Sequence, residues 1–283
     1  MTEQVEDPNG VLAQDDHMRD MDRVRMEVRG IARPTPSVMR VTGRIPGADP
    51  VQWRVPNLAV RIEVETPATG RPVSRIYTIR SFDAGAGTVE IDFVLHEDDS
   101  PAMRWLHAAQ PGDTVWLTGP RPHFVPPFSP GKRAALFADD TAIPAVHAIL
   151  EAWPEGVPGA IWIDSGDRAA MEALPRVAGV DRHLMLRDPG CAAGTADRLF
   201  AAATALDAPL DWTIWAAGER DEMRRLRAHF RALNLPREAL QVLGYWKRGT
   251  SSSELDRRRL ASYEAALAKG LRMEDMIDSD EAV

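Results

Sequence analysis

Cysteine is almost absent from this sequence: Cys191 is the single thiol among 283 residues. One thiol cannot form an internal disulfide, and it cannot supply the ligands of a cysteine-rich zinc or iron–sulfur site. Cys191 follows a Pro-Gly pair, and no cysteine–histidine context is visible around it. We therefore expect a loop residue rather than a nucleophile.

Long apolar runs and an excess of positive charge are also missing. No uninterrupted run approaches the ~20 apolar residues of a membrane span, so we predict no membrane insertion. The net charge of −8 argues against a nucleic-acid surface. Residues 1–22 are acidic and polar, without the apolar core of a signal peptide, and predict a flexible leader. Together these features predict a cytoplasmic protein.

What is present is an ordinary globular composition, with 44% hydrophobic and 27% charged residues, in a chain long enough for two domains. The first half favours strands, because apolar and polar residues alternate in several short segments. A turn-rich stretch at 83–87 predicts a hairpin, and Gly119-Pro120 is expected to end the series. Predicted strands are 23–29, 37–45, 58–65, 74–81, 88–96 and 114–118, with a helix at 102–109. About six short strands with one helix suit a small antiparallel barrel.

A proline-rich stretch at 125–132 marks a boundary, after which strands and helices alternate. Such alternation predicts parallel βαβ units with helices on the faces of a sheet. A charged helix at 252–268 is expected to close the chain. The predicted strands are 134–137, 160–163, 182–186, 212–217 and 240–245, and the predicted helices are 141–153, 194–206 and 219–233.

An Arg-x-Tyr-Thr box, Arg75 to Thr78, is the most informative motif. An arginine can hold a diphosphate in bidentate fashion. A tyrosine two residues later, on the same strand face, offers a ring and a hydroxyl to a flavin, and Thr78 offers a small hydroxyl. Taken alone, the box is ambiguous, because any antiparallel strand can carry Arg, Tyr and Thr on its solvent-facing side, and that is the commoner case.

Three further segments narrow the choice: 90–105 with Asp92-Phe93-Val94-Leu95-His96, 139–145 with Asp-Asp-Thr-Ala-Ile-Pro-Ala, and Trp215–Glu219 with Gly244–Gly249 downstream. In order and spacing, the four segments resemble the siderophore-interacting proteins, flavin-dependent ferric-siderophore reductases. The resemblance implies an N-terminal antiparallel FAD-binding β-barrel followed by a C-terminal α/β parallel-sheet nucleotide-binding domain, as in ferredoxin reductases. We place the barrel at 23–128 and the α/β domain at 132–283.

For FAD, the resemblance assigns Arg75 to the diphosphate, Tyr77 to the flavin and Thr78 to the flavin edge. The N-terminus of the helix near Pro101 is suited to phosphate. For His96, flavin or phosphate contact and a local cap both stay open, and Asp92 is either a turn residue or an anchor behind the site. The full predicted set is Arg75, Tyr77, Thr78, Ile79, Asp92, Val94, His96, Ser100, Ala102 and Met103.

For NAD(P)H, the loop after the strand at 134–137 lies where an α/β sheet binds ligands. There is no GxGxxG fingerprint, and Asp140 and Thr141 are equally explained as helix caps. Trp246 is either a flavin contact or a core residue. Arg168 and Arg220 are candidates for a 2′-phosphate, and the choice between NADH and NADPH stays open. The predicted set is Asp139, Asp140, Thr141, Ala142, Gly218, Glu219 and Trp246.

An anionic ferric siderophore needs cations, for which we predict Arg121, Lys247 and Arg248; ordinary surface cations are the alternative. The resemblance implies hydride transfer from NAD(P)H to flavin N5, then single electrons to Fe(III) and release of Fe(II). The flavin carries the chemistry, so no catalytic side chain is predicted, and iron arrives with its own ligand, so no protein metal site is needed.

Alternatives remain open: a flavin reductase for another acceptor, a ferredoxin-reduced enzyme, and a siderophore-binding protein without turnover. The last is motivated by departures from the family pattern. Glu97 and Ser100 stand where glycine is usual, with Asp98 and Asp99 between them, and Ala138 replaces another glycine. Acids there would repel a diphosphate. A monomer is expected, because nothing in the sequence requires a dimer.

Overall fold

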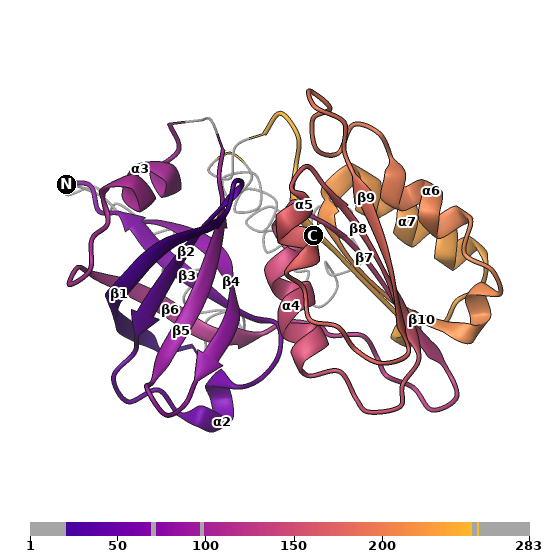
Figure 1. Ribbon diagram of the computed structural model, residues 1–283, viewed down its shortest axis with the longest axis horizontal. Helices are drawn as coiled ribbons and strands as arrows, with labels where there is room; N and C mark the ends of the chain where they lie inside the picture. The colour runs from indigo at the N-terminus through magenta and orange to yellow at the C-terminus, as the bar shows by residue number, and fades with distance from the viewer. Residues whose placement is uncertain (1–20, 69–71, 97–98, 251–253, 255–283) are drawn as a thin grey trace, which may run out of the picture. The chain divides into compact units, whose positions relative to one another are not determined.

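The computed structural model describes residues 21–68, 72–96, 99–250 and 254 (Figure 1). Most of the expected acidic leader and nearly all of the expected helix at 252–268 lie outside these residues. Contacts divide the chain into two compact units. The barrel unit comprises residues up to 31, 41–91 and 97–123, and the sheet unit comprises 32–40, 92–96 and the residues from 124 onward. The domain limits 23–128 and 132–283 remain predictions.

Six antiparallel strands close into a barrel in the order β1-β2-β5-β4-β3-β6, which confirms the predicted barrel. Two short helices accompany them. The elements are β1 (Arg23–Thr35), β2 (Val38–Arg44), α2 (Pro50–Trp53), β3 (Leu58–Glu65), β4 (Val73–Asp83), β5 (Thr88–Val94), α3 (Pro101–Ala108) and β6 (Thr114–Pro122).

Strict alternation explains why β3 forms a wall of this barrel. Its residues Leu58, Val60, Ile62 and Val64 are all buried, while the residues between them, Ala59 excepted, are more exposed. A strand with one apolar face must turn that face toward a core. The barrel therefore fills its interior with side chains that the sequence pattern already marked as apolar.

The expectation that Gly119-Pro120 ends the strand series is wrong. β6 continues to Pro122, because Leu58 and Ala59 of β3 pair with Pro122 and Arg121. Gly119 has a φ of +147°, and a Cβ there would come within 3.1 Å of the Ala59 carbonyl oxygen. Glycine thus allows β6 to lie close to β3 and to continue to Pro122, although the Gly-Pro pair is a typical signal for the end of a strand.

The sheet unit is built on five parallel strands in the order β11-β10-β7-β8-β9. This confirms the predicted parallel α/β domain. The order reverses beside β7, so the carboxyl ends of β7 and β10 form the switch point at which such sheets bind ligands. The strands are β7 (Arg133–Asp139), β8 (Gly159–Ser165), β9 (Val180–Leu186), β10 (Trp212–Glu219) and β11 (Leu240–Trp246).

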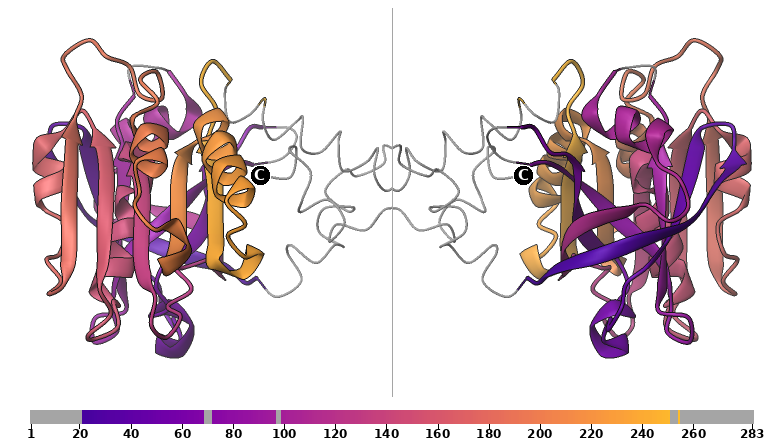
Figure 2. Two further views of the ribbon diagram at one scale, coloured as in Figure 1. Left: turned by 90° about the vertical axis from the view of Figure 1, so that its right-hand side faces the viewer. Right: turned by 90° about the vertical axis from the view of Figure 1, so that its left-hand side faces the viewer.

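Helices cover both faces of this sheet (Figures 1 and 2). Alternate residues of β7 enter different cores: Leu136 packs with Val146 and Ile149 of α4, and Phe137 packs with Leu226 of α7. Both faces of β7 are therefore buried, which explains why its sequence is a continuous apolar run. The helices are η1 (Asp140–Ala142), α4 (Ile143–Glu151), α5 (Arg168–Glu172), α6 (Arg198–Thr204), η2 (Pro209–Asp211), α7 (Arg220–Ala232) and η3 (Arg237–Ala239).

The helix predictions failed at short elements and at ends. α2 and α5 were not predicted, because four or five residues give too little periodicity to detect. Each has an aspartate cap, Asp49 bonding the Val51 amide and Asp167 bonding the Ala170 amide. The helix expected from residue 194 begins only at Arg198.

Candidate functional site

Arg75 and Tyr77 project from the same face of β4. They pair with Ile62 and Val60 of β3, and directly opposed residues in antiparallel strands share a face. Both side chains are half-buried. β4 pairs with β5 over Ile79–Asp83, so Arg75 and Tyr77 lie on the part of β4 beyond this pairing. Both the guanidinium and the phenol are thus held on one strand face.

Thr78 projects from the opposite face, because it pairs with Ala59. Ile79 pairs with Leu58, lies on the same face as Arg75 and Tyr77, and is buried in the barrel. The Arg75 guanidinium donates a 2.8 Å hydrogen bond to the Ser74 carbonyl oxygen. The box therefore does not present its four residues as one surface. Arg75 and Tyr77 form the half-buried pair, and Thr78 would have to reach any ligand from the other side of the strand.

α3 begins as predicted, with Pro101 in its first turn and Ser100 as N-cap. The Ser100 side chain makes no capping bond, so the first-turn amides of Ala102 and Met103 have no side-chain cap from Ser100. First-turn amides have no intrahelical acceptor. The residues Ala102 and Met103 are themselves buried. The helix end thus keeps the donors that favour an anion.

One of the acids near this helix is neutralised. The Asp99 carboxylate lies 3.2 Å from the Arg104 guanidinium, which also pairs with Glu65. Arg104 belongs to α3 itself, so this cation lies on the same helix. Of the predicted neighbours, His96 is exposed and Val94 is half-buried. The repulsion expected from Asp99 is correspondingly reduced.

Asp92 is buried and bound to Arg40 by two bonds, Nε–Oδ1 at 2.6 Å and Nη2–Oδ2 at 2.9 Å. Both carboxylate oxygens therefore accept from one guanidinium, which is the strong fork geometry of an arginine–carboxylate pair. Asp92 lies within β5 and not in a turn, and its role as an anchor behind the site stays a prediction.

At the carboxyl end of β7, the buried Asp139 carboxylate accepts three hydrogen bonds. Oδ1 accepts from the amide and the hydroxyl of Thr141, at 2.9 and 2.6 Å. Oδ2 accepts from the indole N–H of Trp246 at 2.7 Å. The helix cap expected from Asp140 or Thr141 thus comes from Asp139, and β11 is joined to β7 across the intervening strand.

Glu219, at the end of β10, is the second buried carboxylate of this edge. Its Oε2 accepts from the amides of Asp221 and Glu222 and so caps α7, while Oε1 accepts from the Arg248 amide at 3.1 Å. Gly218 makes room for the arrangement, because a Cβ there would lie 2.7 Å from Asp139 Oδ2. The predicted set Asp139, Gly218, Glu219 and Trp246 therefore does come together.

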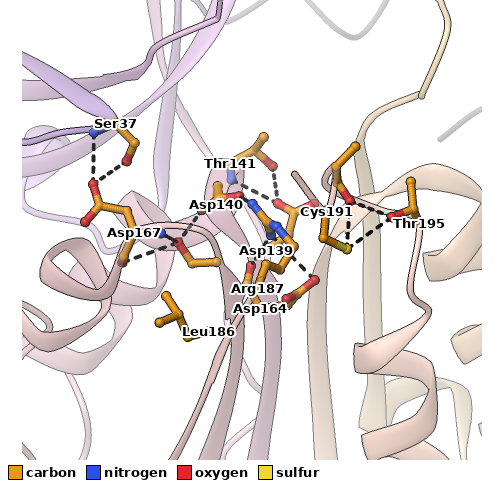
Figure 3. Close-up of polar contacts among 12 residues, drawn as sticks. Ser37, Asp139, Asp140, Thr141, Asp164, Asp167, Leu186, Arg187, Cys191 and Thr195 are labelled. Atoms are coloured by element: carbon orange, nitrogen blue, oxygen red, sulfur yellow. Dashed lines mark hydrogen bonds and ion pairs between the residues drawn. The ribbon is translucent and has the colours of Figure 1, made fainter. Parts of the chain in front are cut away.

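A third group at this edge was not predicted (Figure 3). The buried guanidinium of Arg187 bonds Asp140 and lies 3.5 Å from the Asp164 carboxylate. Asp140 also accepts from the Ser165 hydroxyl. Asp164 and Ser165 follow the predicted strand at 160–163, and parallel strands end at one edge, so sequence position alone could have located them. Arg187 could be assigned to this group only from the fold, because its partners Asp140 and Asp164 are distant in the sequence.

Burial shapes the ionisation of this edge. It raises the pKa of Asp139 to about 6, against the lowering effect of the Thr141 and Trp246 hydrogen bonds. It also raises the pKa of Asp164, although Arg187 opposes the shift. On α7, burial raises the pKa of Glu222 to about 7, while a hydrogen bond from the Phe200 amide works against it. Desolvation disfavours the charged carboxylate in each case.

The predicted substrate cations lie in different units. Arg121 is on β6 of the barrel unit, exposed, next to His123, whose pKa is lowered to about 4 by burial and by the Arg121 charge. Lys247 and Arg248 follow β11 in the sheet unit. The Lys247 ammonium lies 3.8 Å from the Asp221 carboxylate, and Arg248 is exposed.

Of the two arginines considered for a 2′-phosphate, Arg168 is an exposed residue of α5, 3.6 Å from Glu172. Arg220 is half-buried at the start of α7, against Gly244. Within the described ranges, no helix is long and apolar enough to cross a membrane. The same residues contain no group of three or more His, Cys, Asp or Glu side chains placed to hold a metal ion.

Comparison with known proteins identifies the two halves of the chain. A model of the siderophore-interacting FAD-binding domain matches residues 44–124, and a model of the siderophore-interacting protein family matches residues 132–249. The chain is also 41% identical to the ferric acinetobactin reductase of Acinetobacter baumannii over 271 residues, 95% of this chain and 94% of that protein. This chain belongs to the siderophore-interacting protein family. The resemblance seen in the four sequence segments is thereby confirmed.

Solved structures agree with this membership. The siderophore-interacting protein of A. baumannii has a TM-score of 0.84 and 42% identity, over 88% of this chain and 99% of its own. The ferredoxin reductase of carbazole 1,9a-dioxygenase has a TM-score of 0.61 over 79% of this chain and 67% of its own. At 16% identity the second match shows the fold alone, and it confirms the ferredoxin-reductase-like architecture.

The residues present fit the FAD that the matched domain implies. A diphosphate needs cations and N–H donors, which the Arg75 guanidinium and the first turn of α3 provide. An isoalloxazine needs a flat apolar partner with a polar tip, and the half-buried Tyr77 on the face of Arg75 has this character. The donor set on β4 and α3 is therefore chemically matched to this cofactor.

Proposed function

We propose that this member of the siderophore-interacting protein family is a FAD-dependent reductase that uses NAD(P)H to reduce the Fe(III) of a ferric siderophore, releasing Fe(II) for assimilation. The observation that carries this proposal is the 41% identity, across 95% of the chain, to a ferric acinetobactin reductase. A siderophore binds Fe(II) less tightly than Fe(III) when its donors are hard oxygens, so reduction releases the metal.

For FAD, the proposal rests on β4 and α3. The guanidinium of Arg75 would hold the diphosphate, with the amides of Ala102 and Met103 as further donors. Tyr77 would lie against the flavin ring, and Thr78 would contact it from the other face of β4. When bound, FAD supplies acceptance of a hydride from a nicotinamide and release of single electrons to iron. The chain's own part is to hold the ring and keep water from it.

For the nicotinamide nucleotide, the proposed place is the carboxyl edge of β7 and β10, where the strand order reverses. The carboxylates of Asp139 and Glu219 are already bonded within the chain. The Asp140 carboxylate and the Thr141 hydroxyl are bonded within the chain as well. Contacts to the nucleotide would therefore come from neighbouring backbone, including that of Ala142. For the siderophore, Arg121, Lys247 and Arg248 are the proposed cations, because they can attract an anionic chelate within an acidic protein.

We test this function with an absorption spectrum of the purified protein, recorded before and after anaerobic addition of NADPH or NADH. Flavin bands that bleach with the nucleotide, and return when a ferric siderophore is added, would establish cofactor, donor and acceptor together. A protein that takes up no FAD would remove the proposal. Bleaching by reduced ferredoxin but by neither nucleotide would replace the donor. We further propose that the protein works as a cytoplasmic monomer, which gel filtration and cell fractionation can check.

A further inference from the structure

We propose that Asp139 and Glu219 are positioning residues for the substrate cations: they hold the segment 246–248 so that Lys247 and Arg248 meet an anionic ferric chelate. This inference rests on the proposed function. The sequence predicted that Asp139 and Glu219 contact the nucleotide, and the role proposed here is a different one. Three contacts carry it, and all of them lie within the sheet unit.

The first contact fixes the start of the segment. Trp246 ends β11, and its indole N–H donates to Asp139 Oδ2 at 2.7 Å. Asp139 is itself tied to η1 by the two bonds from Thr141. Gly218 lies beside the carboxylate, and any side chain there would displace Oδ2. The indole is therefore held by an acid that has little freedom to move.

The second contact fixes the backbone two residues later. The Arg248 amide donates to Glu219 Oε1 at 3.1 Å, while Glu219 Oε2 is held by the amides at the start of α7. Gly194 allows this approach, because a Cβ there would lie 2.7 Å from Glu219 Cγ. One carboxylate thus links the segment to the N-terminus of a thirteen-residue helix.

The third contact closes the segment into a turn, in which the Thr250 amide donates to the Lys247 carbonyl oxygen at 3.2 Å. Gly249 takes the left-handed conformation, with φ at +71°. Arg248 is exposed, and in the described part of the chain its guanidinium has no ion-pair partner. The backbone of the residue is therefore fixed while its charge faces solvent, which is the arrangement of a preorganised binding cation.

The carboxylates themselves are poor ligands for a nucleotide. Each is only 3% exposed, and each already accepts three hydrogen bonds from the chain. Their charge would also repel a phosphate. What they can do is orient the groups that they bind, and the cations nearest to both along the chain are the half-buried Lys247 and the exposed Arg248.

The test uses Trp246→Phe, which removes the indole donor and keeps an aromatic ring. Trp153→Phe is the matched control, because its indole N–H also bonds within the sheet unit, to the Val157 carbonyl oxygen at 2.9 Å. The probes are the ferric complexes of catechol and of acetohydroxamate, of which the first is anionic and the second neutral. Dissociation constants are measured by equilibrium dialysis on the FAD-loaded protein, and KM values in the reductase assay.

We expect Trp246→Phe to raise the dissociation constant and KM for the catecholate complex about tenfold, as loss of one positioning contact does. The acetohydroxamate complex should show less than half of that change, and Trp153→Phe should change neither. In a double-mutant cycle with Arg248→Gln, the two effects should overlap rather than add, because the tryptophan acts through the cation.

Equal effects on the anionic and the neutral complex, or additive effects in the cycle, would overturn the positioning role. A larger rise in the KM for NADPH than in that for the catecholate complex would do the same, and would favour nucleotide contact by this edge. Retained FAD and an unchanged far-ultraviolet circular dichroism spectrum show that the variant is folded. The proposed function fails separately, if the unaltered protein binds the chelates but reduces neither.

Discussion

Arg40 and Asp92 form a two-point ion pair between β2 and β5, with Nε–Oδ1 at 2.6 Å and Nη2–Oδ2 at 2.9 Å. The side chain of Asp92 is 5% exposed and that of Arg40 is 21% exposed. A pair of this kind contributes more than a surface contact, because removal of one partner leaves a poorly solvated charge without compensation.

Replacement of Asp92 with asparagine should therefore lower the free energy of unfolding by roughly 2–3 kcal/mol, measured by urea denaturation. Glu172→Gln is the control, because it breaks the exposed pair with Arg168, and it should change the free energy by less than about 0.5 kcal/mol. Similar effects of the two substitutions would show that the Arg40 pair is no stronger than a surface contact.

Glu222 should make stability depend on pH. Burial raises its pKa in the folded protein from 4.5 to about 7, so the folded state binds a proton that the unfolded state has released. The protonated group contributes stability that is complete below pH 4.5 and is lost as the pH rises through 7. Glu222→Gln cannot ionise and can still accept from the Phe200 amide.

The stability of Glu222→Gln relative to the unaltered protein should therefore increase by roughly 1–3 kcal/mol between about pH 4.5 and about pH 8. Urea denaturation at several pH values measures this difference. Substitution of the exposed Glu155 by glutamine controls for the loss of one negative charge. A difference that does not vary with pH would mean that Glu222 is not protonated in the folded state.

Arg75→Gln should weaken FAD binding about 10- to 100-fold, because it removes a charge-assisted contact to the diphosphate. Fluorescence titration of the FAD-free protein measures the dissociation constant. Arg61→Gln is a close control: it removes the same charge from the neighbouring strand, at the residue that pairs with Ile76 and so lies on the opposite face. An equal loss of affinity in both variants would contradict a specific contact by Arg75.

Gly218→Ala tests the packing of the β7–β10 edge. The added methyl group would lie 2.7 Å from Asp139 Oδ2 and 2.9 Å from Cγ. This overlap should cost about 1–3 kcal/mol of unfolding free energy in urea. Gly30→Ala, in β1, has open space around its Cβ and should stay within about 0.5 kcal/mol of the unaltered protein. If Gly218→Ala is as stable as Gly30→Ala, the edge is looser than the structure shows.

The sequence alone determined the two-part architecture. Alternation of apolar residues in β3 and β5 requires a strand with one buried face, and the short apolar run of β7 requires a strand buried on both. The Arg75–Thr78 box, Pro101 at the start of α3 and the turn residues before β5 could be located because their signals are local. The order of the four segments was enough to indicate the family.

Only the tertiary structure decided which polar groups meet. Asp139 and Trp246 are 107 residues apart, and Asp92 and Arg40 are 52 apart, so no local pattern links them. Burial is likewise a property of the folded chain, and it places the Arg187 guanidinium among aspartates and raises the pKa of Glu222. The sequence gives the chemical type of each side chain, but packing between distant segments determines its partners and its exposure to solvent.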